Sequence, residues 1–290
     1  MAKLLEGKPV AREILDRVRD NICQLVTQHG EIPGLTVLKV GNDAGSEAYA
    51  RAIRRSAKNV QIPFTLLELP EEMSLGDVKG TIERLNLDPS VAGVMVLQPL
   101  PRHIPKSLPA ELVDPRKDVD GVTLTNVGRL EAGMASLVPS TPQGGIEILR
   151  YYDIPVASRH AVVIGRSQVV GKPLATMLLQ LDATVTICHS RTPDLGTYTR
   201  DADIVALAAG RAGLLTREMV QRKAAVLDFG VNVQGDEMVG DADPNVADVV
   251  AALTPVPGGT GVVTTAVLMR NTLRAIQTAL LGAGTSVTDE

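Results

Sequence analysis

The chain has 290 residues, a formal net charge of −4 and 44% hydrophobic residues. This length exceeds the usual size of one domain, so we expect two domains that share a cleft. No apolar run reaches the roughly 18 residues that cross a bilayer. The negative net charge does not attract nucleic acid, and an aromatic content of 2% offers few side chains on which bases could stack. We therefore expect neither a membrane nor a nucleic-acid partner.

Cysteine usage and the N-terminus indicate the compartment. The two cysteines, Cys23 and Cys188, have no Cys or His neighbours at the spacing of metal ligands, so we expect reduced thiols and no metal site. The first residues contain no apolar segment followed by a small-residue cleavage site, which argues against a secretory signal. The expected location is cytoplasmic.

The first half of the chain alternates helical and strand patterns. Apolar residues at three- and four-residue steps predict a long helix over 8–27. The pattern then predicts strands at 35–40, 64–69 and 91–97 and helices at 48–60 and 75–85. A loop rich in proline and charge is expected from there to about Gly121.

A second alternating region follows the proline pair of segment 139–144, which precedes a helical run at 146–151. We predict strands at 161–164, 184–188, 204–208 and 224–228, a helix at 171–181, a glycine-rich loop at 254–264 and a last helix over about 262–281. The fold class is therefore α/β, with two αβ domains flanking a cleft, the second of them Rossmann-like. The expected domains are 1–141, completed by 265–290, and 142–264.

The segment after the strand at 161–164 predicts a nucleotide site. It begins at Gly165 and opens the next helix, an arrangement in which backbone N–H groups at a helix start face a phosphate. It departs from the common glycine-rich pattern, because Ser167 takes the place of the second glycine and Gly171 comes one step late. A plain strand-to-helix turn is the alternative interpretation.

The end of the next strand indicates which dinucleotide would bind. NAD enzymes usually carry a carboxylate there, whereas this chain has the segment 189–192, with sequence HSRT. Arg166, Ser190 and Arg191 could instead donate charge-assisted hydrogen bonds to a 2′-phosphate, which favours NADP. A solvated basic loop is the alternative.

Five segments then carry a resemblance to one family. They are GNDAGSEAY at 41–49, KDVDG at 117–121, PSTPQG at 139–144, GRSQVVGKP at 165–173 and PGGTG at 257–261. In this order they resemble the signatures of the methylenetetrahydrofolate dehydrogenase/cyclohydrolase family, and the resemblance spans roughly residues 4–281. It implies a homodimer that binds NADP and a tetrahydrofolate derivative.

The resemblance also assigns site residues. It implies that Tyr49 and Asp120 are catalytic and bind the substrate, Tyr49 by covering the flat folate and Asp120 by accepting from adjacent pterin N–H donors. Taken alone, Tyr49 could be a packing residue and Asp120 could shape a turn with Asp118. Further substrate contacts are implied for Gln98, Pro257, Gly258 and Gly259. Cofactor contacts are implied for Gly165, Arg166, Ser167, Ser190, Arg191, Gly210, Val231 and Thr264.

Two positions depart from the family pattern. Bifunctional members carry a Lys four residues after the cleft Tyr and a Gln that hydrogen-bonds it; here these positions hold Ile53 and Leu97. Gln98 is expected to point to the other face of the strand. An ammonium donor and its orienting amide have thus become two aliphatic groups, which removes a general acid or base. We predict that cyclohydrolase activity is weak or lost.

A displaced amine is not expected to compensate. Lys58 lies five residues past Ile53, roughly 140° round the helix axis, and Arg54 and Arg55 stay protonated. We interpret these three residues as a solvated basic face of the helix.

The leading hypothesis is NADP-dependent oxidation of 5,10-methylenetetrahydrofolate to 5,10-methenyltetrahydrofolate. Thr260, Val262 and Val263 also replace the Val, Pro and Met usual in the family. One alternative is therefore a folate-dependent one-carbon enzyme recruited to a specialised biosynthetic step. The other is a catalytically silent folate or nucleotide sensor.

Overall fold

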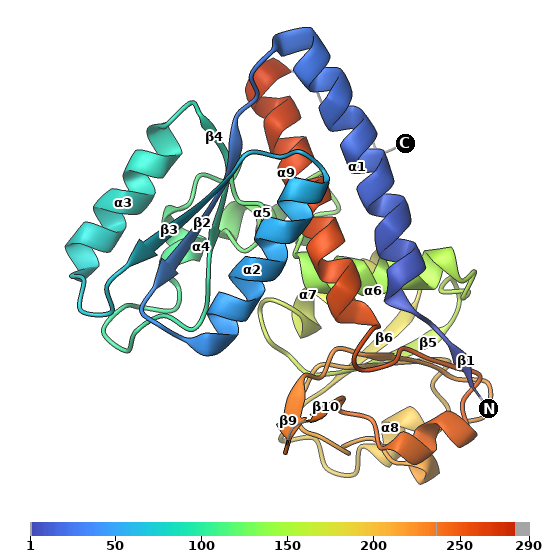
Figure 1. Cartoon of the computed structure of the whole chain (residues 1–290). Helices are drawn as coiled ribbons and strands as arrows, with labels where there is room; N and C mark the ends of the chain where they lie inside the picture. The colour runs from blue at the N-terminus through green and yellow to red at the C-terminus, as the bar shows by residue number, and fades with distance from the viewer. Residues whose placement is uncertain (1, 236, 282–290) are drawn as a thin grey trace. The chain divides into compact units, whose positions relative to one another are not determined.

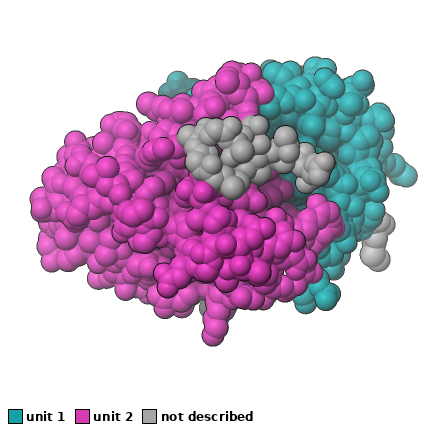
Figure 2. All heavy atoms as spheres, turned by 90° about the horizontal axis from the view of Figure 1, so that it is seen from above, with its two compact units in different colours: residues 1–12, 139–267 teal, residues 13–138, 268–290 magenta. Residues whose placement is uncertain are grey.

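A computed structural model describes residues 2–235 and 237–281 (Figure 1). The chain divides into two compact units, coloured separately in Figure 2. Unit 1 comprises residues 1–12 and 139–267, and unit 2 comprises residues 13–138 and 268–290. The part of the expected C-terminal segment beyond Leu281 lies outside the described residues.

Unit 2 is built on a short parallel sheet. Strand β2 (Gly34–Val40) lies between β3 (Phe64–Leu69) and β4 (Val91–Val96). Every residue of β2 and β4 is buried, as expected for parallel strands covered on both faces. The carboxyl ends of all three strands therefore lie at the same edge of the sheet.

Helices cover the two faces of this sheet (Figure 1). On one face, Leu38 and Val40 of β2 pack with Val78 and Ile82 of α3 (Leu75–Leu87). The opposite face carries α2 (Ala44–Asn59). Unit 2 also contains α4 (Leu108–Leu112), α5 (Leu124–Glu131) and most of α1 (Gly7–His29) and α9 (Thr260–Leu281).

Unit 1 holds a six-stranded parallel sheet in the order β1-β11-β8-β7-β5-β6. These strands are β1 (Lys3–Leu4), β11 (Ala252–Leu253), β8 (Ala225–Asp228), β7 (Ile204–Leu207), β5 (His160–Ile164) and β6 (Thr184–Cys188). The strand order reverses between β5 and β7, which is the switch point where Rossmann-like sheets bind ligands.

The remaining elements of unit 1 connect these strands. They are α6 (Ser140–Tyr151), α7 (Gly171–Gln180), α8 (Gly196–Thr199), the 3₁₀ helices η1 (Arg217–Met219) and η2 (Pro244–Asp248), and the antiparallel pair β9 (Asn232–Gln234) and β10 (Glu237–Val239). The predicted fold class, α/β with two domains and a Rossmann-like second domain, is confirmed. No helix in the described residues is long and apolar enough to cross a membrane.

The structure corrects three sequence expectations. Helix α6 begins at Ser140 rather than at 146, because Pro142 lies in its first turn, where no intrahelical N–H bond is needed. The segment expected to be only loop contains α4. Helix α9 begins at Thr260, inside the expected glycine-rich loop. The shortest strands, β1 and β11, span two residues each, too few for a periodic pattern to reveal.

Candidate functional site

In unit 2, the start of α2 is tied to the end of β4. The Asp43 carboxylate caps α2 by accepting from the backbone N–H of Ser46 at 2.8 Å. The Ser46 hydroxyl donates to the backbone oxygen of Gln98 at 2.9 Å. Segments about 50 residues apart are thereby held together at the carboxyl edge of the sheet, the usual position of a site in parallel sheets.

Tyr49 and Asp120 interact electrostatically at this edge, and both are half-buried. Burial, together with the charge of Asp120, raises the pKa of the Tyr49 hydroxyl. Burial and then the nearby charge of Asp118 raise the pKa of Asp120 to about 7. Within the described residues, no donor forms a hydrogen bond with the Asp120 carboxylate. Such a group is suited to accept hydrogen bonds from a ligand.

Asp118 lies two residues earlier but has a different role. It is buried, and its carboxylate accepts from the backbone N–H of Thr123 at 2.8 Å and from Nδ2 of Asn126 at 2.9 Å. The backbone N–H of Gly121 donates to the Asp118 carbonyl, which closes a turn with Asp120 inside it. The turn-shaping alternative therefore describes Asp118, whereas the Asp120 side chain takes no part in these bonds.

Ile53 and Leu97 are both enclosed. Ile53 has an exposed fraction of 0% and Leu97 of 2%. The side chain of Gln98 is exposed, and its Oε1 accepts from the backbone N–H of Leu100 at 3.3 Å. Gln98 therefore places no amide in the interior beside Leu97, and neither enclosed aliphatic side chain can transfer a proton.

Lys39 is a buried lysine on the α2 face of the sheet, and its ammonium is held by two carboxylates. Its Nζ lies 2.6 Å from a carboxylate oxygen of Glu68 on β3 and 3.3 Å from one of Glu47 on α2. The Glu68 hydrogen bond raises the pKa of Lys39, with a further contribution from Glu47. Glu47 and Tyr49 are two positions apart on α2, roughly 160° round the axis when counted the shorter way. The ammonium thus lies toward the opposite side of the helix from Tyr49.

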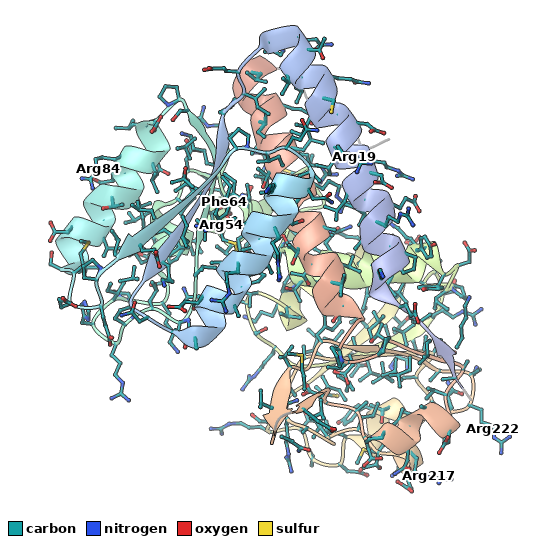
Figure 3. All side chains as sticks on the ribbon, in the orientation of Figure 1. Arg19, Arg54, Phe64, Arg84, Arg217 and Arg222 are labelled. Carbon is teal, nitrogen blue, oxygen red and sulfur yellow. The ribbon has the colours of Figure 1, made fainter. Side chains whose placement is uncertain are left out.

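The basic face of α2 is solvated, as expected. Arg54, Arg55 and Lys58 are all exposed. The guanidinium carbon of Arg54 lies 5.5 Å from the ring centre of Phe64 on β3, which is a cation–π contact between two residues that Figure 3 labels. These three charged side chains therefore form a solvent-exposed face of α2.

In unit 1, two loops meet at the switch point of the sheet. Gly165 follows β5 with φ +140°, and a Cβ built on it would lie 2.3 Å from the carbonyl oxygen of Ala208, which follows β7. A Cβ on Gly171, the first residue of α7, would lie 2.2 Å from the Gly165 oxygen. Only glycine fits either position, so strand, loop and helix approach as closely as dinucleotide binding requires.

The exposed loop before α7 offers donors to a phosphate. The Ser167 hydroxyl accepts from the backbone N–H groups of Val170 and Gly171 at 3.2 and 3.3 Å. Its own hydrogen therefore remains available to an acceptor such as a phosphate oxygen. Arg166 and Ser167 are both exposed. These residues fit an anionic group.

The loop after β6 is closed by three local hydrogen bonds. The His189 N–H donates to Oγ1 of Thr192 at 2.9 Å, the Thr192 N–H donates to the His189 carbonyl at 2.8 Å, and the Arg191 N–H donates to Nδ1 of His189 at 3.1 Å. The side chains of Ser190 and Arg191 are exposed. The loop thus presents a hydroxyl and a guanidinium, with no carboxylate between residues 189 and 192.

The other sequence-predicted contacts in unit 1 differ in exposure. Gly210, Val231, Pro257 and Gly258 are exposed, and Gly259 is buried. Thr264 is also buried, and its hydroxyl donates to the Thr260 carbonyl within α9. The Thr264 hydroxyl is therefore engaged inside the helix.

Two family models match the chain. The model described as the tetrahydrofolate dehydrogenase/cyclohydrolase catalytic domain matches residues 5–120, and the NAD(P)-binding domain model of the same family matches residues 139–280. The chain belongs to the tetrahydrofolate dehydrogenase/cyclohydrolase family. It is therefore a member of an enzyme family, with that family's NAD(P)-binding domain.

Individual relatives agree with this assignment. The bifunctional protein FolD of Thermomicrobium roseum is 48% identical over 273 residues, covering 94% of each chain. The crystal structure of the bifunctional FolD enzyme of Campylobacter jejuni is 37% identical with a TM-score of 0.92, covering 96% of this chain and 99% of its own. The Trypanosoma brucei FolD structure, complexed with NADP cofactor and inhibitor, is 33% identical with a TM-score of 0.92, covering 97% and 99%.

Sequence reasoning missed a buried carboxylate in this dehydrogenase-family chain. Asp241 has an exposed fraction of 0%. Its Oδ2 accepts from the backbone N–H groups of Ala209 and Gly210 at 2.8 and 2.9 Å, and its Oδ1 accepts from the Arg211 N–H and from Nδ2 of Asn232 at 2.8 and 2.9 Å. Asp241 thus fixes the loop after β7 at the switch point.

Asp228, at the end of β8, extends this network. Its carboxylate accepts from the backbone N–H groups of Asp241 and Ala242 at 3.0 and 2.9 Å. Its own N–H donates to Oγ1 of Thr254 at 2.7 Å, and Oγ1 of Thr260 donates to its carbonyl at 2.9 Å. One residue therefore connects the Asp241 segment with both ends of the glycine-rich loop.

Two glycines give a sequence signal for this pair. A Cβ on Gly240 would lie 2.1 Å from Oδ2 of Asp228, and one on Gly230 would lie 2.3 Å from Oδ1 of Asp241. Each carboxylate packs on backbone that only glycine leaves open. An Asp near a strand end with glycines close by in the sequence could have indicated the network.

Proposed function

We propose that this enzyme oxidises 5,10-methylenetetrahydrofolate to 5,10-methenyltetrahydrofolate with NADP, and that its cyclohydrolase activity is weak or absent. The observation that carries the proposal is the contrast within unit 2. Asp120, which interacts electrostatically with Tyr49, accepts no hydrogen bond from a donor in the described residues, whereas the positions expected to serve proton transfer hold the buried side chains of Ile53 and Leu97.

Tyr49 and Asp120 would bind and orient the substrate. The carboxylate of Asp120 offers two acceptor oxygens to the adjacent N–H donors of a pterin, and the ring of Tyr49 offers a flat apolar surface. Because the pKa of Asp120 is raised to about 7 by burial and by Asp118, ligand donors would be needed to favour the ionised form. Substrate binding and ionisation of Asp120 would then reinforce each other.

Unit 1 would hold the cofactor by its phosphates. The Ser167 hydroxyl and Arg166 lie in the loop before α7, where a pyrophosphate would bind. Ser190 and Arg191 are exposed after β6, where a 2′-phosphate would distinguish NADP from NAD. The relative from Trypanosoma brucei, complexed with NADP, supports this choice of dinucleotide.

The chemistry asks little of the protein side chains. When bound, the nicotinamide accepts a hydride from the one-carbon bridge of the substrate. The residues above contribute orientation, so that the donor carbon and the acceptor ring meet at a reactive distance. No general acid or base is needed for this step, which is why replacing a Lys and a Gln by aliphatic residues is compatible with it.

Hydrolysis of the methenyl product is different. Opening the bridge with water requires proton transfers, and Ile53 and Leu97 can perform none. Lys39 is held by Glu68 and Glu47, and the hydrogen bond with Glu68 raises the pKa of Lys39, so its ammonium stays protonated and is a poor proton donor. The methenyl product would therefore leave the enzyme intact.

One assay tests the proposal. Purified protein is mixed with 5,10-methylenetetrahydrofolate and either NADP or NAD, NADPH or NADH formation is followed by absorbance, and the methenyl product is then followed against a buffer blank. We expect reduction of NADP, slower reduction of NAD, and methenyl decay no faster than in buffer. Enzyme-dependent methenyl decay would contradict the loss of cyclohydrolase activity.

The same assay distinguishes the alternatives. Tight binding of both ligands without turnover would favour a silent sensor, and turnover only with an added acceptor would favour a specialised biosynthetic enzyme. Cytoplasmic location and homodimeric assembly, both expected from the sequence and its resemblance, stay predictions. Fractionation and mass measurement in solution would check them.

A further inference from the structure

The turn that carries Asp120 is attached to a distant helix by one buried side chain. Asn271, on α9, has an exposed fraction of 0%. Its Nδ2 donates to the carbonyl oxygen of Val119 at 3.0 Å and to that of Val138 at 2.8 Å. Both hydrogens of one amide group are thus used, and one of them holds the residue immediately before Asp120.

The second hydrogen bond of Asn271, to Val138, holds the segment where the chain leaves unit 2. Val138 is the last residue of unit 2 before the chain passes into unit 1 at Pro139, and α9 returns to unit 2 at Leu268. Asn271 therefore lies one helical turn after the point of return and binds the segment at the point of exit. The amide joins three segments that are remote in sequence.

Two further sets of contacts hold the turn in place. Val119 is fully buried, and a Cβ built on Gly93 of β4 would lie 2.7 Å from its Cγ1, so the glycine lets Val119 approach the sheet. Asp118 fixes the following residues through Thr123 and Asn126. The backbone is thus held on one side by Asp118 and on the other by Asn271.

We propose that Asn271 is a positioning residue for Asp120, fixing the backbone from which this carboxylate reaches the pterin. The inference rests on the proposed function, because it assumes that Asp120 binds the substrate. A buried amide that bonded only to its own helix would stabilise α9 without influencing ligand binding. Because Asn271 donates to Val119, the residue before Asp120, its removal should weaken binding of the folate and not binding of NADP.

The test is a double-mutant cycle on the full-length protein with Asn271→Leu and Asp120→Ala. Binding of tetrahydrofolate in the presence of NADP is measured by calorimetry. We expect N271L to weaken tetrahydrofolate binding roughly ten-fold when Asp120 is present and less than two-fold in the D120A background, because the energetic effect of a positioning residue disappears with the group that it positions. The Kd for NADP should change by less than two-fold.

The adjacent residue provides a matched control. Thr272 is also fully buried on α9, but its hydroxyl donates to the carbonyl of Leu268 in the same helix at 2.8 Å. Thr272→Val removes a buried hydrogen bond of similar length and should leave the Kd for tetrahydrofolate unchanged. If N271L does not fold, Asn271→Ser, which keeps one donor, should show a smaller effect with the same dependence on Asp120.

Four results would overturn the inference. N271L could weaken tetrahydrofolate binding equally in both backgrounds, or weaken NADP binding to the same degree, and either would mean a general structural role. N271L could also leave tetrahydrofolate binding unchanged while D120A weakens it, which would leave the proposed function standing. If D120A itself has no effect, the proposed role of Asp120 is wrong, and the inference fails with it.

Discussion

Asp241 in unit 1 and Asp120 in unit 2 are aspartates near the carboxyl ends of parallel strands, yet they are used in opposite ways. Asp241 accepts four hydrogen bonds from the loops around it, three of them from consecutive backbone N–H groups. Within the described residues, Asp120 accepts none. A carboxylate saturated by its own protein builds the loops of a site, and one that is left without donors is available to a ligand.

Asp118 shows that the number of hydrogen bonds an aspartate accepts does not depend on which unit it lies in. It lies in the same turn as Asp120 but is saturated by Thr123, Asn126 and Val122, so it behaves like Asp241. Its negative charge also contributes to the raised pKa of Asp120. Asp118 therefore influences both the conformation of the turn and the ionisation of Asp120.

The largest expected effect comes from removing the saturated carboxylate. Asp241→Ala removes a fully buried carboxylate and leaves its four donors without their acceptor, so we expect the free energy of unfolding to fall by about 3 kcal/mol. The KM for NADP should rise more than the KM for the folate, because the loop after β7 loses its anchor. Chemical denaturation and steady-state kinetics measure both.

A matched variant sharpens that result. Asp20 is exposed on α1, and Asp20→Ala should change neither quantity. If Asp241→Ala raised both KM values equally, the carboxylate would be a general stabilising group without a specific link to the cofactor loops.

The next effect concerns the aliphatic pair in unit 2. Ile53→Lys together with Leu97→Gln should restore a proton-transferring ammonium with an amide partner, and we expect enzyme-dependent methenyl hydrolysis to rise at least about ten-fold. The single variant Ile53→Lys should lower the free energy of unfolding more than the double variant does, because the buried ammonium at position 53 then lacks a partner.

A control separates chemistry from repacking. Ile53→Met with Leu97→Gln keeps the changed volume and the amide but adds no amine, and it should leave hydrolysis at the level of buffer. Equal hydrolysis by the Lys and Met double variants, or no gain in either, would show that the pair does not explain a loss of cyclohydrolase activity.

The smallest effect is a pH dependence of stability. The pKa of Asp120 is about 7 in the folded protein, against about 4 in an unfolded chain. Between these values the folded state binds more protons, so this group's contribution to the stability falls as pH rises from about 4 to 7. Asp120→Asn should therefore be more stable than the wild type at pH 8, by on the order of 1 kcal/mol because the group is only half-buried.

Thermal denaturation at two pH values checks this sign. The difference between Asp120→Asn and the wild type should be present at pH 8 and should disappear toward pH 4. A variant that is less stable than the wild type at pH 8 would mean that the Asp120 carboxylate is satisfied in the folded protein, and the comparison with Asp241 would fail.

The periodic parts of the fold could be predicted from the sequence. Strands 64–69 and 184–188 have the predicted bounds, because short apolar runs bounded by turn residues leave little ambiguity. The bounds of α6 and α9 could not be predicted as well, since Pro142 and the glycines of the last loop suggested irregular chain where the first turn of a helix tolerates them.

The candidate site divides in the same way. The sequence by itself determined the chemistry present, including the family signatures, the aliphatic pair Ile53 and Leu97, and the absence of a carboxylate between residues 189 and 192. Only the tertiary structure decided that Asp241 is saturated by backbone donors, because those donors lie 30 to 32 residues earlier in the chain. The same reason explains why Asn271 was not predicted: its bonds to Val119 and Val138 join positions 152 and 133 residues apart.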